Sequence, residues 1–399
     1  MNGIHESSGS GVVFVDTTLR DGAQSPGVFF DQPTKIAFIS TLSALGVGEI
    51  EIGAPCLGSE EEEDLRTLIH LPVAARLFTW NRALEEDVTS SFRIGAQKVH
   101  ISFPVSDQHI HSVLRKSRSW VRDRLVRLVT YAQREGLAVQ VGFEDASRAD
   151  WEFLKELGGE ARAAGAERIR FCDTVGRMDP VRVGEQIGRF QEIGLPVEIH
   201  CHNDLGMATA NTVAGYQAGA RFLSTTVSGV GERAGNASME EVAFALEYAL
   251  GQSTGIQLTR LAAMGRWIHQ VMGRALSPYR PILGSRVFHH ASGIHVDGVL
   301  KDAENYETYP PEIAGLKRKI HVTHMTGRSG VRNVLERMGY APSPEILEKL
   351  WPIVRREGIE RRGIVPPQVI LEIFLRLLDE RSGVPSSFFR QGIARGTDA

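Results

Sequence analysis

Residues 197–228 read VEIHCHNDLGMATANTVAGYQAGARFLSTTVS, and this stretch shows the pattern from which the fold can be predicted. The run at Val197–His202 predicts a strand, Ala208–Ala218 predicts a helix, and Phe222–Ser228 predicts a second strand. A strand, a helix and a second strand in succession form the unit of a parallel sheet. On the first strand, the period of two points His200 and His202 to one face, where both can reach one metal ion.

The same alternation runs through the first part of the chain. Eight candidate strands lie at Val12–Thr18, Glu49–Gly53, Ala74–Thr79, Lys98–Phe103, Ala138–Phe143, Arg168–Asp173, Val197–His202 and Phe222–Ser228. A helical stretch follows each, at Thr34–Leu45, Glu61–His70, Leu84–Ile94, Trp120–Glu135, Asp150–Ala164, Pro180–Ile193, Ala208–Ala218 and Met239–Leu250. Eight such units within about 250 residues predict a (β/α)8 TIM barrel. The alternative, a doubly wound open sheet, usually carries a glycine-rich phosphate loop after an early strand, and none is visible here.

After about Gln257 the alternation stops, and the rest of the chain is predicted to be mostly helical. We predict a TIM-barrel catalytic domain at residues 1–256, a linker and lid subdomain with the segment SGIH at 257–330, and a C-terminal helical subdomain at 331–399. The helices predicted after the barrel are Leu258–Met272, Pro344–Glu357 with Ser343 as its cap, and Pro366–Leu378. SPYRPILGS is expected to be a linker, and the chain from about Arg390 to be frayed.

The composition excludes several classes of protein. With 42% hydrophobic residues, 23% charged residues and a net charge of -3, the chain has the make-up of a globular protein without a nucleic-acid-binding surface. No apolar run of about 18 residues predicts a membrane helix, and MNGIHESSGSG lacks the features of a secretory signal, so a cytoplasmic protein is expected. Cys56, Cys172 and Cys201 are too few and too scattered for a disulfide framework or a structural zinc site.

Polar residues gather where the predicted strands end, which is the active-site face of a TIM barrel. They are Asp16, Arg20, Asp21, Glu144, Asp145, Asp173, Thr174, His200, His202, Glu232, Arg233 and Asn236. Charges of both signs at one mouth indicate a metal and an anionic substrate. Two histidines with the carboxylate of Asp21 would suit a divalent cation such as Zn²⁺, Mn²⁺, Co²⁺ or Mg²⁺. Arg20 is either a structural ion pair or a group that stabilises a developing enolate or alkoxide.

Two further segments have both a structural and a functional interpretation. GVGERAGN at 229–236 is either a tight turn that needs positive φ at its glycines, or a loop that lets the backbone approach a bulky cofactor and turns Asn236 toward the metal. SGIHVDG at 292–298 lies outside the predicted barrel, where a lone histidine is more often structural. His295 could instead swing over the barrel mouth as an acid or a base.

Seven motifs together make the chain resemble the DRE-TIM metallolyase family, in particular homocitrate synthases and isopropylmalate synthases. They are DTTLRDGAQSPGV at 16–28, EIEIGAPCLGSEEE at 49–62, VGFEDASRAD at 141–150, DTVGRMDP at 173–180, HCHNDLGMATAN at 200–211, GVGERAGNASMEEV at 229–242 and SGIHVDGVLKDAENYE at 292–307. The second and third are most similar to those of the nitrogenase-associated homocitrate synthases. The resemblance implies a TIM barrel, a divalent metal and acetyl-CoA as co-substrate.

The resemblance also implies a reaction and a set of site residues. The reaction would be a Claisen-type condensation of acetyl-CoA with a 2-oxo acid, 2-oxoglutarate first among them, followed by hydrolysis of the thioester. The metal would be held by Asp21, His200 and His202, with Asn236 beside it or bound to it. The substrate would be bound by Arg20, Gln24, Glu144 and Thr174, and CoA would lie near Glu232, Arg233 and Gly235. Catalysis would use Arg20 to polarise the thioester carbonyl and the alkoxide, Glu144, and His295 as an acid or a base.

Three residues depart from the family pattern and leave alternatives open. Ala23 stands where relatives carry Glu, Asn or Asp. Gln140 stands where lysine-pathway homocitrate synthases carry an Arg for the far carboxylate of 2-oxoglutarate. Lys319 lies near the position of a catalytic Tyr that some relatives carry. Another acceptor such as phosphonopyruvate, oxaloacetate or 2-oxoisovalerate therefore stays open, as do a retro-aldol lyase of the hydroxymethylglutaryl-CoA lyase type and a binding barrel without catalysis.

The position of His295 predicts the assembly. Because it lies beyond the last predicted barrel strand, this residue can take part in the chemistry only if the C-terminal part folds back onto a barrel. The SPYRPILGS linker makes docking on a neighbour's barrel as easy as docking on its own. We therefore expect a domain-exchanged homodimer, with small-molecule substrates and with neither nucleic acid nor a membrane as a partner.

Overall fold

The computed structural model describes residues 11–382, which fold as two compact units. The first unit comprises residues 11–277 together with 281–283. The second comprises residues 278–280 together with 284–382. Among residues 11–382 there is no helix whose length and apolar character would let it cross a membrane.

The first unit is a closed barrel of parallel strands, which confirms the predicted TIM barrel. Its eight strands are β1 (Val13–Asp16), β2 (Glu49–Glu51), β3 (Arg76–Arg82), β4 (Lys98–Pro104), β5 (Ala138–Glu144), β6 (Arg168–Asp173), β7 (Val197–Cys201) and β8 (Phe222–Thr225). Each strand pairs with its neighbours in sequence, and β1 closes the barrel by pairing with β8, with Val13 beside Phe222 and Asp16 beside Thr225.

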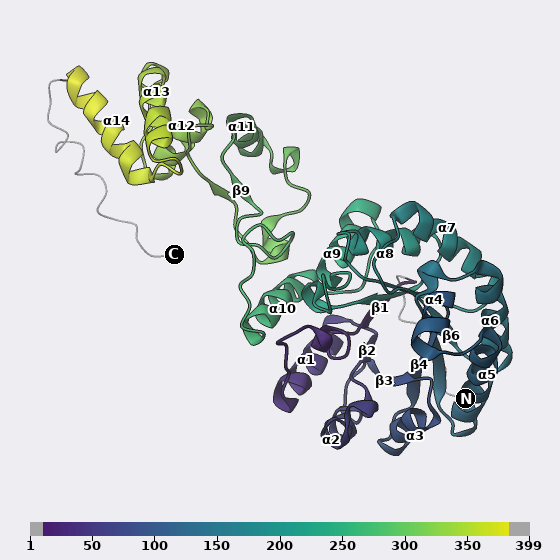
Figure 1. The fold of residues 1–399 in the computed structure, drawn as a ribbon. Coiled ribbons are helices and arrows are strands. Elements are labelled where there is room, and N and C mark those ends of the chain that lie inside the picture. The colour runs from purple at the N-terminus through teal and green to yellow at the C-terminus, as the bar shows by residue number, and fades with distance from the viewer. Residues whose placement is uncertain (1–10, 383–399) are drawn as a thin grey trace. The chain divides into compact units, whose positions relative to one another are not determined.

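Helices cover the outside of the strand ring (Figure 1). The longer ones are α1 (Gln32–Leu45), α2 (Ser59–Leu68), α3 (Glu85–Arg93), α5 (Arg118–Arg134), α6 (Trp151–Ala163), α7 (Pro180–Phe190), α8 (Ala208–Gln217) and α10 (Leu258–Val271), and the short ones are α4 (Asp107–His109) and α9 (Met239–Phe244). Capping side chains fix several starts: Asp31 accepts a hydrogen bond from the N–H of Thr34, and Asp150 accepts one from the N–H of Phe153. Such caps satisfy backbone donors that the first helical turn leaves unpaired.

Several predicted elements differ in their bounds from the observed ones, and two of these differences have a clear structural basis. The third strand runs over Arg76–Arg82 rather than Ala74–Thr79, because the polar Asn81 belongs to it. The side chain of Asn81 is buried and accepts a hydrogen bond of 2.7 Å from the hydroxyl of Ser91, so its polarity is satisfied inside the fold. The helix predicted at Met239–Leu250 is an α-helix only as far as Phe244, because a π-helical turn over Ala245–Ala249 follows.

The inside of the barrel carries a buried network of ionisable side chains. Its deeper members are Glu49, Glu51, Lys98, Arg168, Arg170 and Glu198. Arg170 donates to Glu198 and also lies 3.1 Å from Glu51. Lys98 and Arg168 both bond to Glu49, and Arg168 lies 3.1 Å from Glu198. Because a buried ion loses hydration that only its partners can replace, each of these groups depends on the others.

The network sets the ionisation of its members. Burial alone would raise the pKa of Glu51, but the guanidinium groups of Arg170 and Arg20 hold that pKa well below its ordinary value. Burial, assisted by the charge of Arg170, lowers the pKa of His100 to about 3. The carboxylate is therefore ionised and the imidazole is neutral at neutral pH.

The second unit has a two-stranded sheet and four helices among the described residues. They are β9 (His289–His290), α11 (Gly293–Lys301), β10 (Lys319–Ile320), α12 (Arg328–Arg337), α13 (Pro344–Glu360) and α14 (Pro367–Ser382). Ser343 accepts a hydrogen bond from the N–H of Ile346, which confirms the cap predicted for α13. The sequence patterns missed α11 and α12, whose apolar periodicity is interrupted by glycines such as Gly298 and Gly330. The predicted frayed end from Arg390 lies outside the described residues.

We predict that Glu51→Gln destabilises the barrel strongly. The amide keeps the size of the side chain but leaves the buried guanidinium groups without one of their counter-charges, a change that typically costs about 3–5 kcal/mol. The free energy of unfolding from urea titration at pH 7 measures this loss.

The matched control is Glu156→Gln, which removes a carboxylate that lies 3.2 Å from Arg122 with both side chains largely exposed. This change should alter the free energy of unfolding by less than about 1 kcal/mol. Since the pKa of Glu51 is depressed from its ordinary 4.5, its contribution is present above that pH and lost as the pH falls, so the gap between Glu51→Gln and the parent should narrow in acid. Equal losses in the two variants would contradict the role given to the network.

Candidate metal centre and active site

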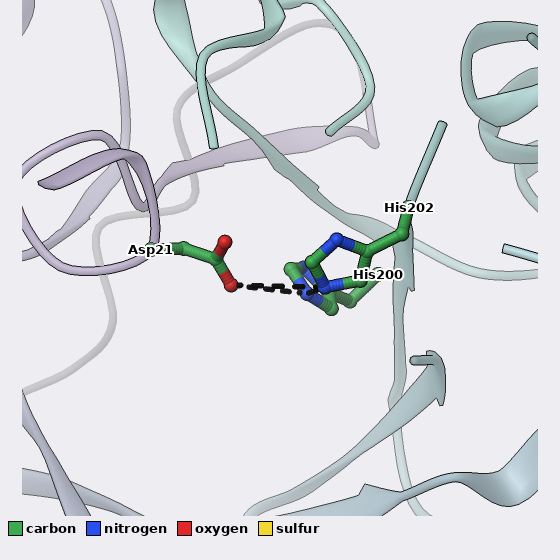
Figure 2. A group of neighbouring side chains, drawn as sticks. All are labelled: Asp21, His200 and His202. Atoms are coloured by element: carbon green, nitrogen blue, oxygen red, sulfur yellow. Dashed lines mark hydrogen bonds and ion pairs between the residues drawn. The ribbon is translucent and has the colours of Figure 1, made fainter. Parts of the chain in front are cut away.

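Three side chains that could hold a metal ion converge at the carboxyl end of the barrel strands (Figure 2). Asp21 comes from the loop after β1, His200 from β7, and His202 from just beyond that strand. The Nε2 atoms of His200 and His202 lie 3.3 Å apart, and they lie 3.4 and 4.0 Å from Oδ2 of Asp21. All three residues are buried. The two imidazoles thus share one face, as the period of the strand predicts.

The three residues fit a divalent cation. Two ligands that each lie about 2.0–2.1 Å from one ion at a roughly tetrahedral angle are about 3.3 Å apart, which is the separation of the two Nε2 atoms. Two lone pairs that face each other at that distance would repel without a cation or a proton between them. Two imidazoles and one carboxylate leave further coordination positions for a substrate, as in catalytic rather than structural sites.

Neighbouring side chains orient these ligands. Nδ1 of His200 lies 3.0 Å from the hydroxyl of Ser224 on β8, so Nε2 faces the site. Asn236 donates from Nδ2 to Oδ1 of Asp21 at 2.9 Å, while its Oδ1 is buried without a hydrogen-bond partner among residues 11–382. Asn236 also donates to the backbone oxygen of Val230 at 3.2 Å, and its predicted role as a metal ligand stays a prediction.

The protonation of the three residues suits metal binding. Burial would raise the pKa of Asp21, but the neighbouring Arg20 and the two histidines hold it well below its ordinary value. Burial and the adjacent His200 lower the pKa of His202 to about 4. At neutral pH the carboxylate is therefore ionised and the imidazole of His202 carries a free lone pair, which is the form that binds a metal.

Arg20 connects this site to the charged network inside the barrel. Its Nε donates to Glu51 at 2.6 Å, and its NH1 donates to Asp21 at 2.9 Å. The guanidinium carbon lies 5.7 Å from the centre of the Trp80 ring. Arg20 thus forms ion pairs with Glu51 and Asp21, and its role in stabilising an enolate or alkoxide stays a prediction.

A cavity of 210 Å³ adjoins Arg20. Most of its lining is apolar, and it also includes Gln24, which the sequence predicts to bind substrate. The residues that line it are Leu19, Arg20, Ala23, Gln24, Val28, Phe29, Phe30, Lys35, Gly53, Ala54, Cys56, Leu57, Glu61 and Trp80. A molecule bound beside Arg20 and the metal ligands could extend a side chain into this space.

A second polar cluster surrounds Glu144 at the end of β5. Oε1 of Glu144 lies 2.9 Å from Nδ1 of His109, and this contact is the main reason that the pKa of His109 is raised. The carboxylate of the next residue, Asp145, accepts a hydrogen bond from Arg148. The backbone N–H of Asp145 donates to the hydroxyl of Thr174 at 2.8 Å. The sequence analysis missed His109, although it follows β4 closely and so lies at the same mouth.

The loop that carries Glu232, Arg233 and Gly235 is a constrained turn. Arg233 has a φ of 53° and donates to both carboxylate oxygens of Asp204 and to the backbone oxygen of Thr174. Gly235 has a φ of 89°, and a Cβ on it would meet the backbone oxygen of Gly229 at 2.1 Å. The loop thus requires glycine for its backbone, and its predicted proximity to CoA stays a prediction.

His295 lies in the second unit, on α11, and is exposed. Its ring packs against that of Tyr306, with ring centres 4.3 Å apart and the planes inclined by 31°. Gly298 makes room for the phenol, because a Cβ there would meet Cε2 of Tyr306 at 2.2 Å. Lys319, near the position where some relatives carry a catalytic Tyr, lies on β10, and the tyrosine that contacts His295 is Tyr306.

Comparison with known proteins assigns these features to one family. The pattern of the HMGL-like family matches residues 11–268, and that of the homocitrate synthase post-HMGL domain-like family matches residues 282–359. The chain is 42% identical to 2-isopropylmalate synthase 2 of Caldanaerobacter subterraneus subsp. tengcongensis, over 88% of this chain and 91% of that protein. It is also 42% identical to the homocitrate synthase of Frankia alni, over 83% of this chain and 95% of that protein.

The barrel is also similar to solved structures. The hydroxymethylglutaryl-CoA lyase of Pseudomonas aeruginosa superposes with a TM-score of 0.59 at 20% sequence identity, and the match covers 66% of this chain and 94% of that one. At this identity the likeness concerns the fold alone.

We predict that His200→Ala and His202→Ala each abolish binding of a divalent metal. Removing one of three ligands destroys the geometry of the site, and losses of at least about 100-fold in affinity are typical. Metal content after reconstitution with Zn²⁺ or Mn²⁺ and dialysis, measured by mass spectrometry, tests this. His111→Ala is the control because His111 is exposed, and it should keep its metal. Full occupancy in both ligand variants would place the metal elsewhere.

Proposed function

Because the chain belongs to the HMGL-like family and carries a homocitrate synthase post-HMGL domain-like segment, we propose that it condenses acetyl-CoA with a 2-oxo acid. In this reaction the acetyl methyl group loses a proton, its carbon attacks the ketone carbon, and water then cleaves the thioester to release CoA. The observation that carries the proposal is the convergence of Asp21, His200 and His202 beside the guanidinium of Arg20. Relatives at 42% identity are named as synthases of this kind.

Arg20 is proposed to stabilise the negative charge that develops on oxygen. A divalent metal held by Asp21, His200 and His202 would act as a Lewis acid on the 2-oxo acid. Arg20 has Nε and NH1 tied to Glu51 and Asp21, and this fixes the plane of the guanidinium. Its NH2 group makes no hydrogen bond to another residue among 11–382, so it can donate to an enolate or alkoxide oxygen. Charge stabilisation by a donor already held in place is typically worth about 100-fold or more in kcat.

Two pairs of side chains could move protons. Glu144 is held against His109 at 2.9 Å, and a carboxylate and an imidazole in contact can exchange a proton with a bound substrate or water. In the second unit, the ring of His295 packs against the ring of Tyr306. We assign acid–base roles to Glu144 and His295, with His109 and Tyr306 as their positioning residues. Thr174 and Gln24 are proposed to bind the 2-oxo acid, and Glu232, Arg233 and Gly235 to lie near CoA.

The identity of the acceptor is a finer question. The motifs favour 2-oxoglutarate, which would make the product homocitrate, while Ala23 and Gln140 leave room for phosphonopyruvate, oxaloacetate or 2-oxoisovalerate. The names of the two relatives point to different products. A retro-aldol lyase on the same barrel would release no CoA thiol from acetyl-CoA and a 2-oxo acid, so the same assay separates it from a synthase.

We also propose that the protein acts as a homodimer that exchanges its second units. His295 lies beyond the barrel, and the segment at 277–285 joins the two units. Each second unit would place His295 at the barrel mouth of the partner subunit.

The proposed reaction predicts that thiol release from acetyl-CoA depends on an added 2-oxo acid, and that Arg20→Lys slows it. Lysine keeps the positive charge but loses the planar fork that reaches Glu51, Asp21 and an oxyanion together, so kcat should fall by roughly 100-fold with little loss of metal. Arg122→Lys, on the exposed face of α5, is the control and should keep its rate. Near-normal turnover in Arg20→Lys would make Arg20 a structural residue only.

The proposed exchange of units predicts complementation between two inactive variants. Mixing Arg20→Ala with His295→Ala and allowing subunits to exchange should restore up to about a quarter of the activity, because half the dimers are mixed and each has one intact site of two. Native mass spectrometry shows whether mixed dimers have formed. If they form and no activity returns, each active site is built from one chain.

A further inference from the structure

We infer that the acceptor is a 2-oxo acid with a short, uncharged, apolar side chain, such as 2-oxoisovalerate, rather than a dicarboxylate such as 2-oxoglutarate. The inference rests on the proposed function and narrows it to one substrate class. Four features of the first unit support it: the carboxylate partners of the basic groups inside the barrel, the bonding of Gln140, the tautomer of His100, and the lining of the cavity beside Arg20.

The basic side chains inside the barrel already have carboxylate partners. They are Arg20, which is 11% exposed, and the buried Lys98, Arg168 and Arg170, and the carboxylates that they contact are Asp21, Glu49, Glu51 and Glu198. Because each of the four already contacts at least one carboxylate, none is left unpaired to receive a second carboxylate of the substrate. The NH2 nitrogen of Arg170 has no hydrogen-bond partner among the described residues, but the charge of this guanidinium is met by Glu51 and Glu198, its side chain is 1% exposed, and it does not line the cavity.

Both the nitrogen and the oxygen of the Gln140 side-chain amide are hydrogen-bonded. Its Nε2 donates to Glu198 at 2.8 Å, and its Oε1 accepts from Arg168. The residue is fully buried. Turning Gln140 toward a substrate would leave a buried carboxylate and a buried guanidinium each without a hydrogen bond, which makes that rotation costly. Gln140 therefore does not serve as a receptor for a distant carboxylate.

The ring nitrogen of His100 that has no partner within residues 11–382 is a hydrogen-bond acceptor, which does not bind an anion. Its Nδ1 lies 2.7 Å from Oε1 of Glu51, and a carboxylate in contact requires a proton on that nitrogen. Since burial and Arg170 keep the imidazole neutral, Nε2 carries a lone pair and accepts hydrogen bonds. That Nε2 is buried without a partner and lies where a Cβ on Gly142 would be, 2.0 Å from it. A carboxylate brought here would meet another acceptor and be repelled.

The cavity beside Arg20 suits an apolar side chain. Ala23, Ala54 and Trp80 line it, and Phe29 and Leu57 are 82% and 74% exposed, as apolar groups at a binding site often are. Its one other cation, Lys35, is bonded to Glu61 at 2.9 Å and to Asp64 at 3.0 Å. At 210 Å³ the cavity has room for a side chain of a few carbons. A carboxylate in it would lose its hydration without gaining an unpaired cation.

The test compares acceptors with the metal-loaded, full-length protein. Thiol release from acetyl-CoA is measured with pyruvate, 2-oxobutyrate, 2-oxoisovalerate, 2-oxoglutarate, oxaloacetate and phosphonopyruvate. We expect the best monocarboxylate to exceed every one of the dianionic acceptors by at least about 100-fold in kcat/KM. A dianionic acceptor that equals or exceeds the best monocarboxylate would overturn the inference and leave the proposed function intact. No thiol release with any acceptor would instead overturn the proposed function.

A pair of variants tests the cavity itself. Ala23→Leu fills the space beside Arg20, so the ratio of kcat/KM for 2-oxoisovalerate to that for pyruvate should fall at least about tenfold. The matched control, Ala163→Leu, places the same change on the exposed face of α6 and should leave the ratio unchanged. If both variants keep the parental ratio while metal content and thermal stability are normal, the acceptor's side chain does not occupy this cavity and the inference fails.

Discussion

The buried ion pairs inside the barrel are the constraint on which the rest of the structure depends. Charged side chains in a barrel interior are costly to dehydrate, and they persist only when partners from other strands stand at hydrogen-bonding distance. The carboxylate of Glu51 contacts Arg20, Arg170 and His100 at such distances. This one group therefore connects the loop after β1 with β4 and β6. The network therefore demands one register of the strands, and in the barrel the strands β1 and β7 lie on either side of β8.

The candidate site adjoins the same network at the carboxyl end of the barrel strands. Glu198, His200 and His202 follow one another at a period of two, so a single face of one segment carries a member of the ionic network and then two metal ligands. Arg20 donates hydrogen bonds to Glu51 inside the barrel and to Asp21 beside the two histidines. The guanidinium that is proposed to stabilise the reacting oxygen is thus held by the interactions that stabilise the fold, which gives it little freedom to reorganise during the reaction.

Local periodicity was sufficient to predict the eight strand–helix units and the shared face of His200 and His202, because both follow from the spacing of neighbouring residues. The partners of the buried ions were not predictable from the sequence. Arg168 and Glu49 are 119 positions apart, and nothing local indicates that they meet. For the same reason the sequence does not reveal that Gln140, which stands where some relatives carry an Arg for the substrate, is bonded within the barrel to Glu198 and Arg168. Tyr306 was missed because its contact with His295 depends on the absence of a side chain at Gly298.

The fold is proposed to hold a metal between Asp21, His200 and His202 and to direct the acceptor's side chain into the apolar cavity beside Arg20. A crystal structure of the metal-loaded protein with 2-oxoisovalerate, with the metal located by anomalous scattering, tests this most directly. We expect one ion bound by both Nε2 atoms and the Asp21 carboxylate, and the isopropyl group between Ala23 and Trp80. An ion at any other position, or an acceptor that displaces Gln140 from Glu198, would contradict the account.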